Sequence, residues 1–146
     1  MSLIGKPEAM DSHDDIEKGT TLSLDFSKIN EIGNAGFSVL PVVVQDSESG
    51  EVLILAYANE EALRETLRRK EAVFFSTSRN EIWHKGATSG DTLSLVEVQV
   101  NCEQNSLLYL VRPQGQGACH TKNDDGTARS SCYYRSIDTD TDLRFI

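Results

Sequence analysis

The stretch FSVLPVVVQDSESGEVLILAY, residues 37–57, contains two runs rich in apolar and β-branched residues, separated by a short polar segment. Valine, isoleucine and tyrosine favour strands, and Ser, Glu and Gly between two such runs are typical of a turn. We therefore predict a β-hairpin with strands at 37–46 and 51–57. Pro41 has no backbone N–H to donate, which indicates that the first strand lies at a sheet edge or contains a bulge.

A helix is predicted directly after this hairpin, over residues 60–70. Asn59 is a favourable N-cap, and the basic residues 68–70 fall in the last turn, where they complement the helix dipole. Leu63 and Leu67 form a short apolar stripe, so one face of the helix should be buried.

The remaining strand signals complete the predicted fold. Valine alternates with polar residues in the segment at 91–100, which is typical of a half-buried strand. Three other segments are rich in β-forming residues, namely 72–79, 106–112 and 132–137. We therefore expect an α+β fold: a single domain that is mostly β-sheet with one main helix.

Length and charge limit the classes of function. The chain has 146 residues, enough for one domain with its own core, and a formal net charge of −9. Phosphate binding needs a basic patch, so we expect no nucleic-acid partner. The sequence contains neither a long apolar run nor an apolar signal segment, which favours a cytoplasmic protein with no membrane partner. Residues 1–30 are expected to be a disordered acidic leader before a domain at 31–146.

Two of the three cysteines, Cys119 and Cys132, flank a polar segment with the sequence HTKNDDGTARSS. Asp125-Gly126 is a favoured centre for a two-residue hairpin turn. Such a turn would make the two cysteines cross-strand partners with Cβ atoms about 4.5–5.5 Å apart, close enough to share a zinc ion. The alternative is an irregular connection, with the cysteines as structural residues.

The third cysteine, Cys102, follows the predicted strand at 91–100. If the alternation of that strand continues, Cys102 lies on one face and three oxygen-bearing side chains lie on the other, namely Asn101, Glu103 and Asn105. This pattern suits a soft metal on the thiol face and a hard cation on the oxygen face.

Four segments in order along the chain resemble the phosphoribosyl-AMP cyclohydrolases of histidine biosynthesis. They are WHKGATSG (83–90), NCE (101–103), ACHT (118–121) and SCYYR (131–135). The resemblance extends from about residue 42 to residue 136. It implies a hydrolase that uses zinc and magnesium to open the N1–C6 bond of the purine ring of N1-(5-phosphoribosyl)-AMP, a small-molecule nucleotide. It also implies an intertwined homodimer with a zinc site shared between subunits.

The resemblance assigns roles to individual residues. Cys102, Cys119 and Cys132 become the zinc ligands, and three protein ligands leave a fourth position for the water that is the nucleophile. His120 is the expected base. His84 is expected to be a second acid–base or a substrate contact, with packing as the alternative. The residues expected to bind the substrate are Ser78, Arg79, Trp83, Lys85, Thr88 and Ser89.

Two features depart from the family pattern. Asn101, Glu103 and Asn105 occupy the positions of three magnesium-binding aspartates, so a single carboxylate remains. We expect the zinc site to be kept and this degenerate magnesium site to be weakened or lost. The interval between Cys119 and Cys132 is longer than usual by an even number of residues, which keeps both cysteines on the same face of a hairpin.

Two other functions remain open. The first is a related zinc hydrolase for a different N-heterocycle, suggested by the two asparagines. The second is a zinc-holding interaction protein without catalysis, against which the complete set of three cysteines and His120 argues. The alternating aspartates at 137–142 lack the glycine and distal glutamate of a calcium loop, and we expect an acidic tail there.

Overall fold

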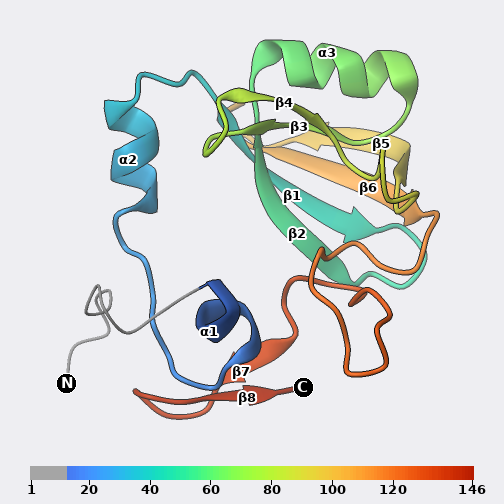
Figure 1. Ribbon diagram of the computed structural model, residues 1–146. Helices are drawn as coiled ribbons and strands as arrows, with labels where there is room; N and C mark the ends of the chain where they lie inside the picture. Colours follow the sequence, from blue (N-terminus) through green and yellow to red (C-terminus); the bar gives the residue numbers. More distant parts are fainter. Residues whose placement is uncertain (1–12) are drawn as a thin grey trace. The chain divides into compact units, whose positions relative to one another are not determined.

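The predicted hairpin is present in the computed structural model, which describes residues 13–146 (Figure 1). Its antiparallel strands are β1 (Leu40–Asp46) and β2 (Val52–Ala58). On its other side β1 pairs in parallel with β6 (Leu107–Pro113). The resulting four-stranded sheet has the order β2-β1-β6-β5, and β5 (Leu93–Val100) is antiparallel to β6.

Of the two alternatives predicted from Pro41, the edge strand was wrong, because β1 lies between β2 and β6. Pairing with β6 begins one residue later, at Val42 opposite Leu107. The missing N–H of Pro41 therefore removes no hydrogen bond to β6. β1 does contain an irregularity in its pairing with β2, but between Val44 and Gln45.

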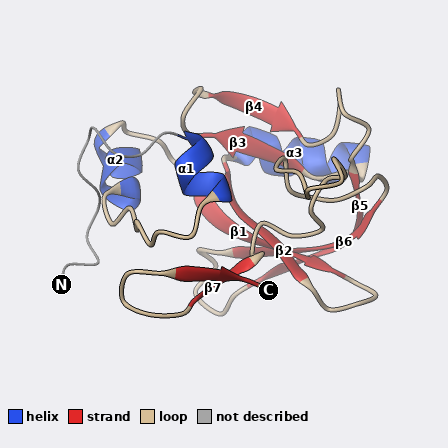
Figure 2. Cartoon of the chain, turned by 60° about the horizontal axis from the view of Figure 1, so that its bottom comes forward, coloured by secondary structure: helices blue, strands red, loops and turns tan. Residues whose placement is uncertain are grey.

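A second layer covers one face of the sheet (Figure 2). It consists of the helix α3 (Glu60–Arg69) and an antiparallel hairpin formed by β3 (Val73–Ser76) and β4 (Glu81–His84). The side chains between the two layers are buried, among them Val42, Val44, Leu53, Phe74, Tyr109 and Val111. The β4 strand was not predicted from the sequence, because four residues that include Glu81 and His84 give too short a pattern.

The helix α3 begins and ends as predicted but buries a different face. Asn59 Oδ1 accepts a hydrogen bond from Ala62 N at 2.9 Å, and Lys70 ends the helix with a φ of 57°. The buried residues are Ala62 and Thr66, whereas Leu67 is 51% exposed, so its predicted burial was wrong. The cause is the Thr66 hydroxyl, which donates to Ala62 O at 2.9 Å and accepts from Val73 N at 3.0 Å.

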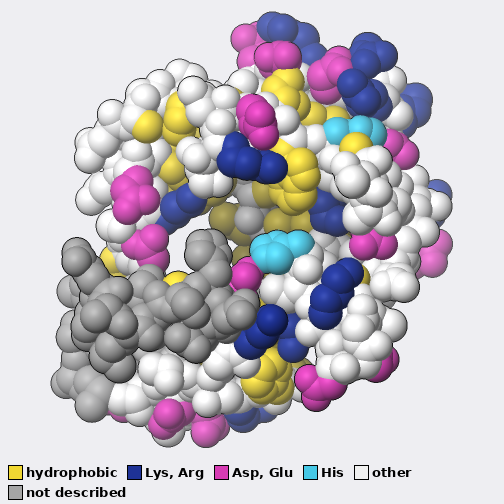
Figure 3. Space-filling model, in the orientation of Figure 1, with side chains coloured by type: hydrophobic (Ala, Val, Ile, Leu, Met, Phe, Trp, Pro, Cys, Tyr) yellow, Lys and Arg dark blue, Asp and Glu magenta, His cyan; other side chains and the backbone are white. Residues whose placement is uncertain are grey.

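Charged side chains cover the outer face of α3. Figure 3 shows acidic and basic side chains interleaved along this helix. Glu65 Oε2 lies 2.8 Å from Arg68 Nε, and Glu65 Oε1 lies 3.0 Å from Arg69 Nε. Hydrogen bonds from Arg68 and Arg69 lower the pKa of Glu65 to about 2. These exposed ion pairs make the outer face of α3 a solvated, charged surface.

Residues 37–132 form one compact unit, and residues 13–36 with 133–146 form another. The second unit contains the helices α1 (His13–Lys18) and α2 (Lys28–Asn34) and an antiparallel pair of strands, β7 (Arg135–Ile137) and β8 (Leu143–Phe145). Within it the Tyr134 hydroxyl donates to Glu17 O, and Arg135 Nη1 donates to Gly19 O at 2.8 Å.

Residues 138–142 of the aspartate-rich segment connect β7 to β8. The strand β8 was not predicted from the sequence. Asp142 Oδ2 accepts hydrogen bonds from the hydroxyls of Thr139 and Thr141, both at 3.0 Å. Through these contacts Asp142 stabilises the turn. Residues 1–12 of the predicted leader lie outside the described residues, and the domain boundary at residue 30 stays a prediction.

The α+β fold with predominant sheet is confirmed, since strands outnumber the helices over residues 13–146. Among these residues, no helix combines the length and apolar character needed to cross a membrane.

Candidate functional site

A cavity of about 430 Å³ opens beside β4, within the larger unit. Its walls come from β4, from the glycine-rich loop at 85–91 and from the start of residues 118–131, which we call the arm. On the face drawn in Figure 3, histidine, lysine and arginine side chains are exposed around apolar ones. The predicted site residues that line the cavity are Arg79, Trp83, His84, Lys85, Thr88, Ser89, Cys119 and His120.

The glycine-rich loop is closed tightly around Asp91. Gly86 and Gly90 have φ values of +81° and +85°, which glycine adopts without steric cost, and Gly90 N donates to Gly86 O at 2.8 Å. Asp91 Oδ1 accepts a hydrogen bond from Gln116 N at 2.8 Å. A Cβ at Gly86 would lie 2.3 Å from the backbone carbon of Asp91. Asp91 thus joins the loop to the segment that leads into the arm.

Lys85 is a buried cation at the base of the cavity. Its side chain is 5% exposed, and its Nζ donates to Asp91 O at 3.0 Å. Burial lowers the pKa of Lys85, while the charges of Asp91, Cys132 and Cys119 act in the opposite direction. The ammonium group therefore lies near the two sulfur atoms.

The thiols of Cys119 and Cys132 are in contact. Hydrogen bonding with Cys132 is the largest cause that lowers the pKa of the Cys119 thiol to about 5. Burial opposes the shift, and Thr121, whose Oγ1 lies 3.0 Å from Cys119 Sγ, adds to it. The nearby His120 also favours the thiolate. Low thiol pKa values are typical of sites where sulfur reacts or binds a metal.

The route by which the two cysteines meet differs from the predicted one. The arm has a three-residue loop, with Asn123 N donating to Thr127 O at 2.8 Å and Gly126 in the left-handed region at φ +86°. Because this loop is one residue longer than the predicted turn, the pairing register changes. Cys119 N donates to Arg129 O at 3.0 Å, and Cys132 N donates to Leu53 O of β2 at 2.8 Å. The predicted direct cross-strand pairing was therefore wrong.

His84 lines the cavity, but its ring nitrogens contact two residues that do not line it, Glu71 and Arg69. Its Nε2 lies 2.7 Å from Glu71 Oε1, and its Nδ1 lies 3.4 Å from Arg69 Nη1. A neutral imidazole with its proton on Nε2 satisfies both contacts, because Nδ1 then accepts from the guanidinium. Protonation of Nδ1 would place two donors against each other. These two contacts fix the orientation of the His84 ring in the cavity wall.

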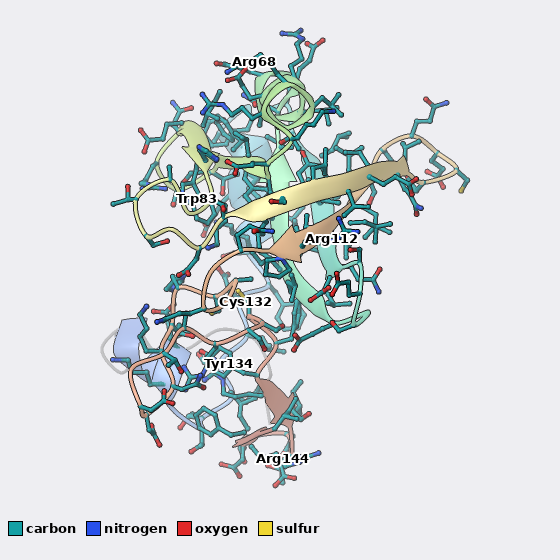
Figure 4. The ribbon with its side chains drawn as sticks, turned by 90° about the vertical axis from the view of Figure 1, so that its right-hand side faces the viewer. Arg68, Trp83, Arg112, Cys132, Tyr134 and Arg144 are labelled. Carbon is teal, nitrogen blue, oxygen red and sulfur yellow. The ribbon has the colours of Figure 1, made fainter. Side chains whose placement is uncertain are left out.

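Cys102 lies far from the thiol pair within one chain. It is exposed in the turn between β5 and β6, whereas Cys119 follows the other end of β6. The seven residues of β6 separate these ends by roughly 20 Å. Figure 4 shows Cys132 beyond the end where β6 finishes, with the β5–β6 turn at the opposite end of the sheet. Within residues 13–146, no three His, Cys, Asp or Glu side chains are grouped to hold a metal ion.

The predicted oxygen-bearing residues converge, but not through strand alternation. β5 ends at Val100, and the residues that follow form a turn. Asn101, Glu103 and Asn105 are joined there by hydrogen bonds between their side chains. Ser78 does not line the cavity, and its hydroxyl lies 3.3 Å from Ser76 Oγ.

Sequence reasoning missed three residues of the site. Lys122 lines the cavity, and its position three residues after Cys119 was a usable signal. Asp91 follows the glycine-rich motif directly, so its turn role was also detectable. Glu71 had no local signal, because its contact with His84 depends on the β3–β4 pairing.

Comparisons with known proteins identify the family of this chain. The family model for phosphoribosyl-AMP cyclohydrolase matches residues 54–134, which include the cavity and the arm. The chain belongs to the phosphoribosyl-AMP cyclohydrolase family. The predicted family and enzyme class are thereby confirmed, and membership implies a small-molecule substrate.

Individual relatives agree with this membership. The chain is 49% identical over 102 residues to a phosphoribosyl-AMP cyclohydrolase of Haloarcula marismortui, covering 70% of this chain and 79% of that protein. A phosphoribosyl-AMP cyclohydrolase of Streptococcus mutans is 43% identical over 81% of this chain and 95% of its own length. A histidine biosynthesis bifunctional protein of Thermus thermophilus is 48% identical over 74% of this chain, but the match spans only 48% of that longer protein.

The glycine-rich loop yields a stability prediction with a matched control. Both Gly86→Ala and Gly90→Ala place a Cβ on a residue with positive φ, which costs roughly 1–2 kcal/mol. Only the Cβ at Gly86 meets backbone atoms, whereas nothing lies within 4 Å of a Cβ at Gly90. Urea unfolding should therefore show a clearly larger loss of free energy for Gly86→Ala. Equal losses of free energy for the two variants would mean that the backbone of Asp91 shifts away from the added Cβ without an energetic cost.

Proposed function

We propose that this chain is a zinc-dependent phosphoribosyl-AMP cyclohydrolase of histidine biosynthesis, which hydrolyses the N1–C6 bond of N1-(5-phosphoribosyl)-AMP. The observation that carries the proposal is the contact between the Cys119 and Cys132 thiols beside His120, at the edge of a cavity with basic walls. A cavity of about 430 Å³ falls within the range typical of small-molecule sites.

The walls of the cavity suit a purine nucleotide with two phosphates. Arg79, Lys85 and Lys122 supply positive charge, and the hydroxyls of Thr88 and Ser89 supply hydrogen bonds. Trp83 offers an apolar surface for the purine ring, and Phe74 packs against it with ring centroids 5.6 Å apart. Predicted contacts from Ser78 would require it to turn from Ser76 towards the substrate.

The sulfur donors fit zinc, which binds thiolates readily. Cys119 and Cys132 supply two ligands from one chain, and the low pKa of Cys119 keeps its thiol ionised near neutral pH. Because Cys102 lies at the other end of β6, we propose that it reaches the pair from a second copy of the chain. The site is then complete only in a homodimer.

The outer face of the sheet supports this dimer. Val52 and Leu55 of β2 are both more than 40% exposed there. A groove of about 370 Å³ crosses the same region and reaches Asn101, the neighbour of Cys102. A second copy bound to this face would bury its exposed apolar side chains. The same interface would include the turn that carries Cys102.

When bound, zinc would supply a Lewis acid that activates water for attack at C6. The imidazole of His120 accepts the proton of the attacking water and returns it to N1 as the N1–C6 bond breaks. The water oxygen remains on C6, and the second proton of the water goes to the exocyclic imino nitrogen, so that C6 becomes a carboxamide. Lys85 holds a positive charge near the sulfur ligands, and His84 fixes the cavity wall through Glu71.

The first experiment measures bound zinc and ring opening in the purified full chain. We expect about one zinc ion per chain, since one set of three cysteines is available, and turnover of N1-(5-phosphoribosyl)-AMP. Zinc without turnover would overturn the proposed substrate and favour the alternative of another N-heterocycle. Failure to bind zinc would remove both hydrolase proposals.

Mixed subunits test whether two copies build the site. Cys102→Ser and Cys119→Ser should each be inactive and deficient in zinc, and Cys102→Ser should fold normally because residue 102 is exposed. A dimer containing one of each variant regains one complete site, so mixing them should restore part of the turnover. If each chain built its own site, the mixture would stay inactive.

The two histidines should behave differently on substitution. His120→Asn removes the proton acceptor and should reduce kcat by roughly 10²–10⁴-fold, while bound zinc is unchanged. His84→Gln keeps a side-chain donor for Glu71 and should have a much smaller effect. Steady-state kinetics and zinc analysis on both variants check this. A larger loss for His84→Gln would reverse the two assigned roles.

A further inference from the structure

The turn between β5 and β6 is closed by its own backbone. Asn101 N donates to Ser106 O at 3.2 Å, and Gln104 N donates to Asn101 O at 3.0 Å. Gln104 has a φ of 55°, in the left-handed region that asparagine and glycine favour. This sharp turn brings the side chains of Asn101, Glu103 and Asn105 together around the residue that bears the third thiol.

Those three side chains form an unbroken relay of hydrogen bonds. Asn101 Oδ1 accepts from the backbone N–H groups of Asn105 and Ser106, both at 2.9 Å. Asn101 Nδ2 donates to Asn105 Oδ1 at 2.7 Å. Asn105 Nδ2 donates to Glu103 Oε2 at 3.1 Å. Both amide oxygens and the carboxylate therefore already have donors.

The orientation of both amides is fixed from the two ends of the relay. Backbone N–H groups can only donate, so the Asn101 atom that faces them must be its oxygen. Its NH₂ group then points to Asn105, whose oxygen must accept. That leaves the Asn105 NH₂ group facing Glu103, an acceptor. No other assignment satisfies every contact.

This arrangement does not fit a magnesium ion. Magnesium prefers anionic oxygens in an octahedral shell, and the turn offers one carboxylate and two amide oxygens that already accept hydrogen bonds. Carboxylates at positions 101 and 105 would instead face each other at the distance now spanned by an N–H···O bond. Like charges that close repel and call for a cation between them.

We propose that the amide relay of Asn101 and Asn105 takes the place of a divalent cation in this turn. The two asparagines are positioning residues that hold the loop around Cys102, and the protein needs no magnesium there. The proposal rests on the proposed function only in that Cys102 serves as a zinc ligand. The shape of the loop is then set by donors within the chain, whatever the magnesium concentration.

Magnesium binding to the zinc-loaded full chain tests the proposal without substrate. Three proteins are compared by thermal unfolding and titration calorimetry with MgCl₂: the natural chain, the double variant Asn101→Asp with Asn105→Asp, and Gln104→Glu. The last adds charge to the same turn but leaves the relay intact, since its side chain takes no part in it. Turnover is measured in parallel with and without magnesium.

We expect no magnesium heat and no change in Tm for the natural chain and for Gln104→Glu. The double variant should lose several degrees of Tm without magnesium, regain them with it, and show binding heat. Magnesium binding by the natural chain that raises its Tm would overturn the proposal, as would a double variant indifferent to magnesium. Absence of turnover in every condition would instead count against the proposed function, because the Tm and calorimetric results do not depend on it.

Discussion

The parallel pairing of β1 with β6 determines where every part of the candidate site lies. It places β6 inside the sheet, so the chain enters this strand at one end and leaves it at the other. The turn before β6 carries Cys102, and the segment after it carries Cys119. The length of β6 therefore separates Cys102 from Cys119 within one chain.

The cavity depends on backbone contacts more than on side-chain packing. Asp91 joins the glycine-rich loop to the segment before the arm, and Lys85 is buried against the same residue. The buried cation of Lys85 is stabilised by negative charge on the nearby sulfur atoms, and that charge is stabilised by the cation. The ionised Cys119 thiol and the position of the loop are therefore parts of one electrostatic arrangement.

Much of the fold was predictable from periodicity, and the failures have physical causes. Runs of β-branched residues identified the central strands, and Asn59 identified the start of α3. The buried face of α3 was not predictable, because Thr66 is buried through hydrogen bonds to the backbone of β3 rather than through apolar character. The sequence motifs located most of the cavity. They could not give the arm's register, which a three-residue loop decides, or the partner of His84, which tertiary pairing decides.

The arm is joined to the sheet at its base. Cys132 N and Ser131 Oγ bond to the backbone of β2, while Cys119 and Ala118 bond to Arg129 and Ser130 across the base. The residues beyond these bonds form a hairpin, and its tip does not contact the sulfur atom of Cys119 or Cys132. Insertions or deletions at the tip therefore leave the ligand geometry untouched. Evolution is free to vary the length and chemistry of this protrusion while the contact between Cys119 and Cys132 stays the same.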